Sequence, residues 1–573
     1  MEKIRIDNLT FQYPLSETLA LSGITLSIQE SEFVVACGKS GCGKSTLLRQ
    51  MKKALVPYGE KSGEVRYEGE LVEELDPRKD ASEIGFVLQN PESQIVTDKV
   101  WHELAFGLES LGLPNSVIKR RVAEMASYFG INSWFRKDVA SLSGGQKQML
   151  NLASVMAMQP KVLILDEPAS QLDPIAATDF LNTVYRINRD LGTTVIISEH
   201  RLEDVFPMAD RVVVLDKGQV LVEGDPSFVA KDLENRKHPM YYGMPSVMRS
   251  FPKEAAEGEK LPLTIREGRL LLEKIMAGKE QDPSEKGKKE NTYSHADTET
   301  DETGDTDVRR RLKKEERSVQ VKELYFRYER TAEPVIRGLN LEIATGELFC
   351  LLGGNGSGKS TTLKLLAGLL KPQRGKIERR DGIISALVPQ DPQALFTEIT
   401  VEEEVLEGMA DMGAGRQLDD GQKVERVNDL LALMEIEHLR KANPYDLSGG
   451  EQQRLAIAKV MAFEPNLLLL DEPTKGLDPF FKRTLGGILK KLTGNGTTVF
   501  MVSHDIDFCA QYADICAMFF DGDITSLGPA KSFFCGNSYY TTSANRLVRR
   551  WRNDIITCEE AREWIGGQAK PFK

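Results

Sequence analysis

The chain has 573 residues, of which 41% are hydrophobic and 28% charged, and its formal net charge is −12. This length exceeds what one hydrophobic core usually holds, so we expect a globular protein of about two to four domains. No apolar run approaches the roughly 18 residues that a membrane-spanning helix needs, so any membrane role must be peripheral. The acidic balance argues against a nucleic-acid partner, because phosphate binding requires a basic face.

The N-terminal residues 1–7 alternate in polarity like a strand and lack the apolar stretch of a signal peptide. This pattern favours a cytosolic protein. The cysteines are scattered, odd in number and without a C-x-x-C pair. They fit reduced thiols in the core better than disulfides or a zinc site.

The second half of the chain repeats the motifs of the first half in the same order, which indicates a tandem duplication. Each half opens with strand-like segments, residues 4–6 and 9–13 in the first half and 319–321 and 324–328 in the second. Tyr13 and Tyr328 end these segments. An aromatic side chain in this place can stack on adenine or can fill a strand edge, and both interpretations stay open.

A glycine-rich loop follows an apolar run in each half, after residues 33–36 and after residues 348–352, and precedes a helical segment. Glycines let the backbone curl so that successive N–H groups point at a phosphate, and the helix adds the positive end of its dipole. Lys44 and Lys359 are predicted to reach the β- and γ-phosphates, and the hydroxyls of Ser45 and Ser360 a Mg²⁺ ion. The two predicted nucleotide-binding loops consist of Gly38, Lys39, Ser40, Gly41, Cys42, Gly43, Lys44, Ser45 and Thr46, and of Gly353, Gly354, Asn355, Gly356, Ser357, Gly358, Lys359, Ser360 and Thr361.

A glutamine, Gln89 or Gln390, follows the next apolar strand in each half. It can reach the metal ion or the attacking water, and its alternative role is to cap the strand; recurrence in both halves favours the functional role. Next comes a serine with paired glycines before an amphipathic helix, which forms either a plain N-cap or a second anion cradle for a γ-phosphate. These residues are Ser143, Gly144, Gly145 and Gln146 in the first half and Ser448, Gly449, Gly450 and Glu451 in the second.

A long apolar run ends in two carboxylates in each half, Asp166 and Glu167, then Asp471 and Glu472. Such a run predicts a strand buried on both faces of a parallel sheet, whose carboxyl end is the edge where α/β sheets bind ligands. We expect the aspartates to hold Mg²⁺ and the glutamates to polarise the water that attacks the γ-phosphate. A histidine ends the next buried strand in both halves, and this recurrence favours a γ-phosphate contact over a structural role. The histidines are His200 and His504.

With these motifs the chain resembles the tandem ATP-binding-cassette ATPases. The resemblance implies an α/β fold of two P-loop NTPase domains in tandem, each with a parallel-core sheet, a helical subdomain and a small antiparallel β subdomain. It implies ATP hydrolysis with ATP and Mg²⁺ as cofactors, tyrosines that stack on adenine, and a metal site that includes the glutamine. It also implies head-to-tail pairing of the halves, so that each phosphate loop works with the serine-glycine signature of the other half.

Both implied sites have their glutamate and histidine, so both are expected to be competent. Two departures from the family pattern put equal turnover in question. Glu451 stands where the signature has glutamine, and Glu199 is interpreted as an insertion before His200.

A narrower likeness concerns residues 89–95 and 100–109, the segments 243–247 and 261–268, and the tail 539–546. These resemble the ATPases of energy-coupling-factor importers, which take up vitamins and cobalt or nickel ions. The resemblance implies an energy-coupling subunit on the cytoplasmic face of the cell membrane. Its partners would be an integral membrane transmembrane subunit and a substrate-binding membrane subunit, with no nucleic acid.

The domain boundaries follow from the repeats and from a change of composition. We expect a cassette at 1–245 with a C-terminal extension at 246–275, a charged linker at 276–318, and a second cassette at 319–530 with an extension at 531–573. Aliphatic residues almost vanish from the linker, which therefore cannot bury enough apolar surface to fold. Its predicted role is to tether the cassettes at high effective concentration.

Acid-rich stretches follow both glutamines, at 89–103 and 390–404, and would suit arginine-bearing helices of a membrane partner. A solvated acidic face is the alternative. Two other functions are weighed. A ribosome-associated tandem cassette protein would carry a long basic linker helix, and a DNA-repair ATPase would insert a coiled coil or zinc module between its motifs. Neither feature is present in this sequence.

Overall fold

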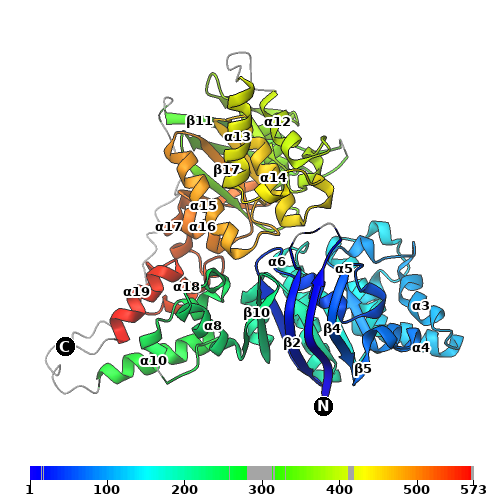
Figure 1. The fold of residues 1–573 in the computed structure, drawn as a ribbon. Helices are drawn as coiled ribbons and strands as arrows, with labels where there is room; N and C mark the ends of the chain where they lie inside the picture. Colours follow the sequence, from blue (N-terminus) through cyan, green and yellow to red (C-terminus); the bar gives the residue numbers. More distant parts are fainter. Residues whose placement is uncertain are drawn as a thin grey trace. The chain divides into compact units, whose positions relative to one another are not determined.

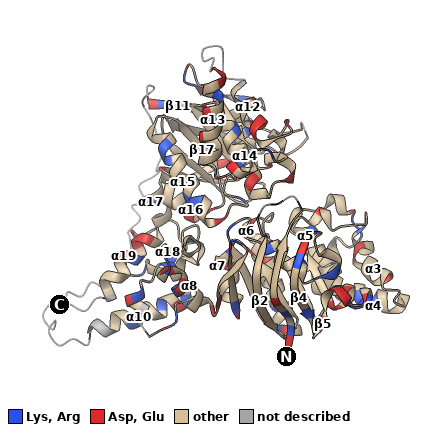
Figure 2. Cartoon of the chain, in the orientation of Figure 1, with Lys and Arg blue, Asp and Glu red and all other residues tan. Residues whose placement is uncertain are grey.

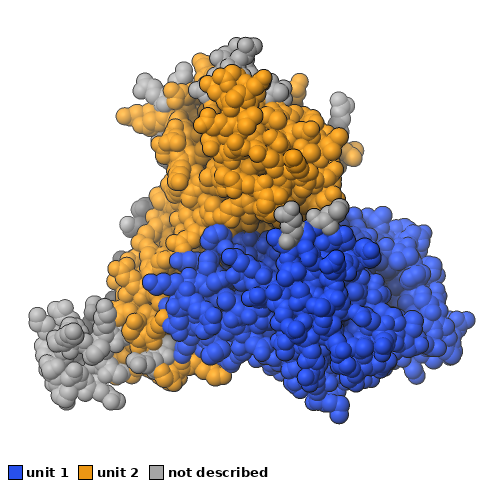
Figure 3. Space-filling view, in the orientation of Figure 1, with its two compact units in different colours: residues 1–248, 478–480 blue, residues 249–477, 481–573 orange. Residues whose placement is uncertain are grey.

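A computed structural model describes residues 1–280 except 15, 17 and 257, residue 313, residues 316–410 except 330, and residues 419–569. It divides into two compact units, residues 1–248 with 478–480 and residues 249–477 with 481–573 (Figure 3). The two units are described separately. Most of the predicted linker, residues 281–312 with 314 and 315, lies outside the described residues.

A six-stranded sheet forms the centre of the first unit, in the order β10-β9-β3-β8-β7-β6. Its strands are parallel except β10, which pairs antiparallel with β9. Every residue of β3, β6, β7 and β8 is buried, as continuous apolar runs predict. The strands are β3 (Phe33–Gly38), β6 (Ile84–Val87), β7 (Val162–Asp166), β8 (Thr194–Ser198), β9 (Arg211–Asp216) and β10 (Gln219–Gly224).

A second, antiparallel sheet shares a hydrophobic core with this one. Its order is β2-β1-β4-β5, from β1 (Glu2–Gln12), β2 (Leu21–Gln29), β4 (Glu60–Tyr67) and β5 (Glu70–Leu71). Buried and more exposed residues alternate along β2, so one face of the sheet packs on the core. Helix α1 (Lys44–Gln50) leaves the end of β3, and α2 (Pro77–Glu83) precedes β6.

The helical subdomain of the first cassette comprises α3 (Val100–Ser110), α4 (Asn115–Tyr128) and α5 (Gly144–Ala157), which have a core of their own (Figure 1). Four more helices belong to the rest of the cassette. They are α6 (Pro174–Leu191), α7 (Leu202–Val205), α8 (Pro226–Asn235) and α9 (Ser246–Arg249).

The second cassette repeats this plan. Its parallel-core sheet has the order β15-β16-β17-β13-β18-β19, and its antiparallel sheet the order β12-β11-β14. The strands are β11 (Arg317–Phe326), β12 (Ile336–Ala344), β13 (Leu348–Leu352), β14 (Arg374–Arg379), β15 (Ser385–Val388), β16 (Leu467–Asp471), β17 (Thr498–Val502), β18 (Ile515–Phe520) and β19 (Asp523–Pro529). The helices are α11 (Lys359–Ala367), α12 (Val401–Ala410), α13 (Asp420–Leu433), α14 (Gly449–Ala462), α15 (Pro479–Gly494), α16 (Ile506–Tyr512) and α17 (Ala530–Gly536). The predicted fold class is thereby confirmed for both halves.

The segment after the first cassette packs with the C-terminal end of the chain, within the second unit. Helix α10 (Ile265–Glu280) contacts α18 (Ser543–Val548) and α19 (Cys558–Ala569) (Figure 1). The guanidinium of Arg269 donates to the carbonyl of Arg546 at 3.1 Å, and Arg562 donates to the carbonyl of Arg249 at 3.1 Å. Residues 249–280 therefore form one helical module with the C-terminal extension.

No helix in the described parts of the chain has both the length and the apolar composition that crossing a membrane requires.

Core packing of the second cassette depends on aromatic stacking in the centre of its sheet. Phe349 in β13 is fully buried and stacks on Phe500 in β17, with ring centroids 5.3 Å apart. Phe349→Ala removes this contact and leaves a cavity, so we expect a loss of about 3–5 kcal/mol in the free energy of unfolding. Urea denaturation followed by circular dichroism measures it.

Phe520→Ala is the matched control, because this ring at the end of β18 is 67% exposed. It should change the free energy of unfolding by no more than about 0.5 kcal/mol. Equal effects of the two substitutions would contradict the assignment of Phe349 to the core.

Candidate functional site

The phosphate loops start where the central strands β3 and β13 end. Gly43 and Gly358, just before α1 and α11, have left-handed φ values of 103° and 111°. A Cβ would lie 2.5 Å from the carbonyl oxygen of Ala20 at the first position and 2.9 Å from that of Val335 at the second. Both contacts are too short, so only glycine fits, and it turns each helix N-terminus toward the space enclosed by the loop.

Lys44 and Lys359 fold back over their own loops. The Lys44 ammonium donates to the carbonyls of Gly38 and Lys39, both at 3.1 Å. The Lys359 ammonium donates to the carbonyls of Gly353 at 3.0 Å and Gly354 at 2.8 Å. Both side chains are buried, and burial lowers the pKa of Lys359 against the opposing effect of Glu472 and Asp471. A buried ammonium group whose hydrogen bonds go to loop carbonyls is well placed to bind an anion such as a phosphate.

Other atoms of the loops fit the same ligand. The hydroxyl oxygen of Ser357 is buried and has no hydrogen-bond partner among the described residues, so a bound phosphate would satisfy it. Cys42 differs from its neighbours, because its side chain belongs to the hydrophobic core and burial raises the pKa of its thiol. We therefore expect Cys42 to contact the nucleotide through its main-chain N–H and not through its side chain.

The serine and the aspartate of each predicted Mg²⁺ site come together at the carboxyl ends of the strands. The Ser45 hydroxyl donates to Asp166 at 2.9 Å, and the Ser360 hydroxyl donates to Asp471 at 3.1 Å. Burial raises the pKa of both aspartates, with Glu167 adding to the effect at Asp166. Hydroxyl and carboxylate oxygens are the ligands that Mg²⁺ prefers, and a cation would offset the cost of burying these carboxylates. The donor set therefore fits Mg²⁺.

Three side chains surround Glu167 in the first cassette. The imidazole of His200 lies 2.8 Å from one carboxylate oxygen, and the amide of Gln89 donates to the other at 3.0 Å. The ammonium of Lys44 lies 3.7 Å away. Burial alone would raise the pKa of Glu167, but His200 and Lys44 lower it to about 2. Glu167 is thus held as a carboxylate beside the predicted metal ligands, which agrees with its predicted role of orienting an attacking water.

Glu472 in the second cassette has different partners. The main-chain N–H of His504 donates to its carboxylate at 3.1 Å, and the imidazole lies at 3.3 Å. Burial raises the pKa of Glu472 to about 7, although the His504 N–H and Lys359 oppose this rise. Gln390, the counterpart of Gln89, is exposed after β15. The glutamate and the histidine therefore meet at both sites, with different hydrogen bonding.

Both glutamates have a left-handed backbone, with φ of 44° at Glu167 and 51° at Glu472. This conformation is uncommon for a residue with a side chain and concentrates at functional sites. The sequence pattern did not predict this left-handed backbone.

The prediction that Glu199 is inserted before His200 is wrong. Asp166 pairs with Ser198 across the sheet, and Asp471 pairs with Val502. Glu199 therefore occupies the position of Ser503, and the additional residue of the first half lies in the connection between β7 and β8. The spacing between motifs could not locate it.

The two tyrosines make the same contact. The Tyr13 hydroxyl lies 3.1 Å from that of Thr46, and the Tyr328 hydroxyl lies 3.0 Å from that of Thr361. Each ring thus stands beside its own phosphate loop, where an adenine attached to a bound triphosphate could stack on it. Adenine stacking remains a prediction.

The signature serines cap helices in both halves. Ser143 begins α5 with a capping box completed by Gln146, and Ser448 begins α14 with one completed by Glu451. The N-cap interpretation therefore holds. Binding of a γ-phosphate by Gly144, Gly145, Gly449 and Gly450 across the two cassettes remains a prediction.

Two acidic residues expected to face a partner point inward instead. The Glu103 carboxylate accepts the N–H groups of Val96 at 3.1 Å and Thr97 at 2.8 Å. Glu404 does the same for the loop before α12, is fully buried, and pairs with Lys459. These carboxylates fix the loops that follow Gln89 and Gln390, so they are not available to arginines of a partner.

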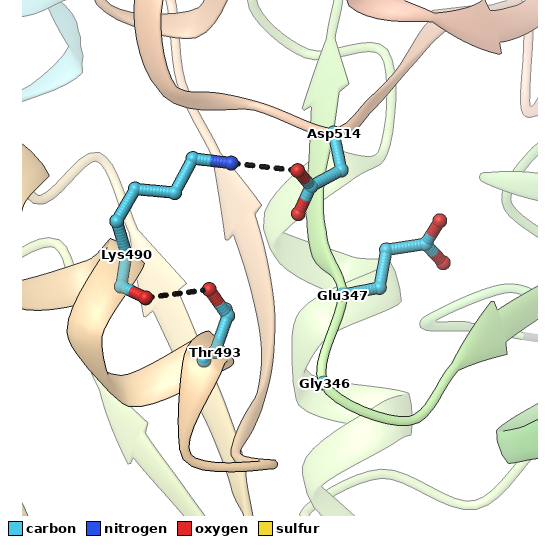
Figure 4. A pocket seen from close by; sticks show the side chains of 6 residues that line it. Gly346, Glu347, Lys490, Thr493 and Asp514 are labelled. Carbon is cyan, nitrogen blue, oxygen red and sulfur yellow. Dashed lines mark hydrogen bonds and ion pairs between the residues drawn. The ribbon is translucent and has the colours of Figure 1, made fainter.

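A hollow of about 380 Å³ lies at the opposite, amino-terminal end of β13. Asp514 there accepts the N–H of Leu348 at 2.9 Å and pairs with Lys490 at 2.6 Å (Figure 4). Asp210 in the first cassette makes the equivalent contacts with Phe33 and Arg189. Because both cassettes anchor their central strand this way, we interpret the hollow as structural. Its lining residues are Gly346, Glu347, Lys490, Thr493, Gly494 and Asp514.

Comparisons with known proteins find similar sequences and structures. The family profile described as "ABC transporter" matches residues 21–170 and 336–475. A "Putative ABC transporter ATP-binding protein" of Bacillus thuringiensis is 40% identical over 570 residues, which cover 97% of each chain. A protein of the same description from Streptomyces coelicolor is 33% identical over 587 residues, covering 98% of this chain and 99% of its own. Among solved structures, CbiO1 from Clostridium perfringens, described as part of the ABC transporter complex cbiONQ, is 30% identical with a TM-score of 0.37. The match covers 41% of this chain and 96% of CbiO1.

Replacing Tyr13 separates adenine stacking from a strand-edge role. In a Lys359→Ala background, where only the first site should bind ATP, Tyr13→Ala should weaken ATP binding by about 1 kcal/mol or more, because base stacking on an aromatic ring is lost. Tyr13→Phe keeps the ring and loses only the contact with Thr46, so its affinity should stay within about twofold. Fluorescence titration with ATP measures both. Full ATP affinity in the Tyr13→Ala variant would contradict adenine stacking and support the strand-edge interpretation.

Replacing the glutamates tests their role in hydrolysis. Glu167→Gln and Glu472→Gln should keep ATP binding but slow hydrolysis at their own sites by about 10² to 10⁴-fold, because an amide cannot polarise water as a carboxylate does. Single-turnover hydrolysis of radiolabelled ATP measures this. Glu109→Gln, a change on the surface of α3, is the control. A double variant that hydrolyses ATP at the native rate would remove both glutamates from the mechanism.

Proposed function

Because this chain belongs to the ABC transporter family, with two ATP-binding cassettes in tandem, we propose that it is the ATP-hydrolysing subunit of an energy-coupling-factor type importer. The cargo would be a vitamin, a related micronutrient or a metal ion. As a family member the chain is an ATPase that binds ATP and uses Mg²⁺. The proposal adds the membrane partners, the location on the cytoplasmic face of the cell membrane, and the class of cargo.

The observation that supports the proposal is that both cassettes bring predicted hydrolytic residues together. Each half has a buried lysine, a serine in hydrogen-bond contact with an aspartate, and a glutamate beside a histidine. These residues lie at corresponding edges of the two sheets. Two such sites in one chain suit a motor in which ATP closes paired cassettes and hydrolysis lets them reopen. The proposed head-to-tail pairing would give each site the signature of the other half.

The chain's own residues would divide the chemistry as follows. The loop N–H groups and Lys44 or Lys359 bind and orient the phosphates. Ser45 with Asp166, or Ser360 with Asp471, would hold Mg²⁺, and the ion would neutralise phosphate charge there. Glu167 or Glu472 would orient the attacking water, and His200 or His504 would keep that glutamate in place.

The proposed docking face for the membrane partner lies beside Gln89. Val96, Trp101 and Phe106 expose apolar side chains there, with exposed fractions of 66%, 44% and 39%. Contiguous exposed apolar patches mark interaction sites, and we propose that these three side chains contribute to one such patch. In the view of Figure 2, basic and acidic residues are interspersed within each of the two units. This distribution suits a protein partner better than a nucleic acid.

A tagged purification from detergent-solubilised host cells tests the proposal. We expect integral membrane proteins to co-purify in stoichiometric amounts, and a small substrate-binding subunit among them would identify the cargo class. Ribosomal particles without membrane proteins would overturn it in favour of a translation-factor role.

The docking face is tested in the same experiment. Trp101→Ala with Phe106→Ala should reduce co-purification at least about tenfold, because aromatic anchors commonly each contribute more than about 1 kcal/mol. Phe228→Ala removes an exposed aromatic in α8, outside the proposed face, and should leave co-purification unchanged. An equal loss in both variants would contradict the assigned surface.

A further inference from the structure

We infer that Glu199 is a positioning residue of the first ATP site, which fixes the main chain on both sides of the catalytic constellation. This inference rests on the ATPase activity of the family and does not require the importer function. It therefore stands or falls separately from the proposed transport role.

One buried carboxylate holds two segments. Glu199 is 2% exposed, and its two oxygens accept the N–H of Ala169 at 2.8 Å and the N–H of His200 at 3.2 Å. Ala169 lies in the loop between Glu167 and Asp173, and Asp173 is the N-cap of α6. Glu199 therefore links the loop that follows the glutamate to the histidine that contacts this glutamate.

Burying this carboxylate is costly, and no ion pair among the described residues offsets the cost. Glu167 lies close enough to repel it, and Arg201 attracts it. Main-chain N–H groups satisfy both oxygens, which makes the arrangement stable. A buried acid that is bound only to catalytic-loop backbone is well suited to hold that backbone in one conformation.

The second cassette shows what happens without this acid. Ser503 takes the place of Glu199, and its hydroxyl accepts the N–H of Asp505 at 3.0 Å. The N–H of His504 then donates to Glu472 itself at 3.1 Å. In the second site the water-orienting glutamate also holds the histidine backbone, whereas in the first site Glu199 performs this task.

The consequence concerns how each glutamate is presented. Relieved of the backbone contact, Glu167 keeps both oxygens for His200 and Gln89. Loss of Glu199 would let the His200 N–H compete for Glu167 and would loosen the loop at Ala169. The expected defect is in the rate of hydrolysis rather than in ATP binding, because neither segment belongs to the phosphate loop.

The test uses the full chain with Glu472→Gln, so that hydrolysis reports the first site. Glu199→Ser introduces the residue type of the second cassette and should lower the single-turnover rate constant about tenfold or more, with the Kd for ATP within about twofold. Glu199→Gln keeps one acceptor oxygen and should fall between this variant and the parent. Glutamine has the same shape as glutamate, so a residue that merely fills space would be replaced by it without any loss of rate. An intermediate rate constant therefore separates the positioning role from a space-filling role.

Asp80→Asn is the matched control. Asp80 is also a buried carboxylate of the first cassette and accepts the N–H groups of Lys53 at 3.1 Å and Ala54 at 3.4 Å, outside the site. It should lower the melting temperature and leave the rate constant unchanged. An unchanged rate constant in both Glu199 variants, or a loss no larger than that of Asp80→Asn, would overturn the inference. If Glu199→Ser fails to fold, Glu199→Gln decides by the same criterion.

Discussion

A buried ammonium group at the end of each central strand is the constraint on which both sites depend. Lys44 is 5% exposed and Lys359 is 6% exposed, and loop carbonyls are their nearest partners. A charge removed from water in this way requires either convergent dipoles or an anion. The left-handed glycines curl the loop so that its carbonyls reach the ammonium group, and the helix that follows supplies N–H groups to the same space. The arrangement of the loop therefore suits a phosphate.

The environment, rather than the residue type, sets the state of each glutamate. The pKa of Glu167 is about 2, whereas that of Glu472 is about 7. Both carboxyl groups are buried, which raises the pKa of each, but the imidazole and ammonium groups approach Glu167 more closely than their counterparts approach Glu472. Because Glu199 accepts the His200 N–H, the Glu167 carboxylate does not bind that N–H and stays in contact with the imidazole. The two sites thus differ in charge distribution on one common scaffold.

The sequence allowed prediction of the features that follow from strand order. Buried apolar runs that end in polar residues must bring those residues to one sheet edge, and Ser45 and Asp166 do meet there. Tertiary contacts could not be predicted in the same way. Three features depend on the folded backbone. Glu103 and Glu404 turn inward, and Glu199 occupies the position that Ser503 has in the other half. Residues 249–280 pack with the C-terminal helices.

Fusion of the two cassettes in one chain makes such differences possible. In a dimer of identical cassettes every substitution appears at both sites, whereas here Glu199 and Ser503 can differ because each occurs once. The same holds for the surfaces beside Gln89 and Gln390. Helix α3 exposes Trp101 and Phe106, but the corresponding positions of α12 are Glu402 and Glu407, which pair with Arg440 and Lys459. An apolar face on one cassette and a charged face on the other would suit a partner with two different contacting segments. The two cassettes thus differ at the proposed docking surfaces as well as at the ATP sites.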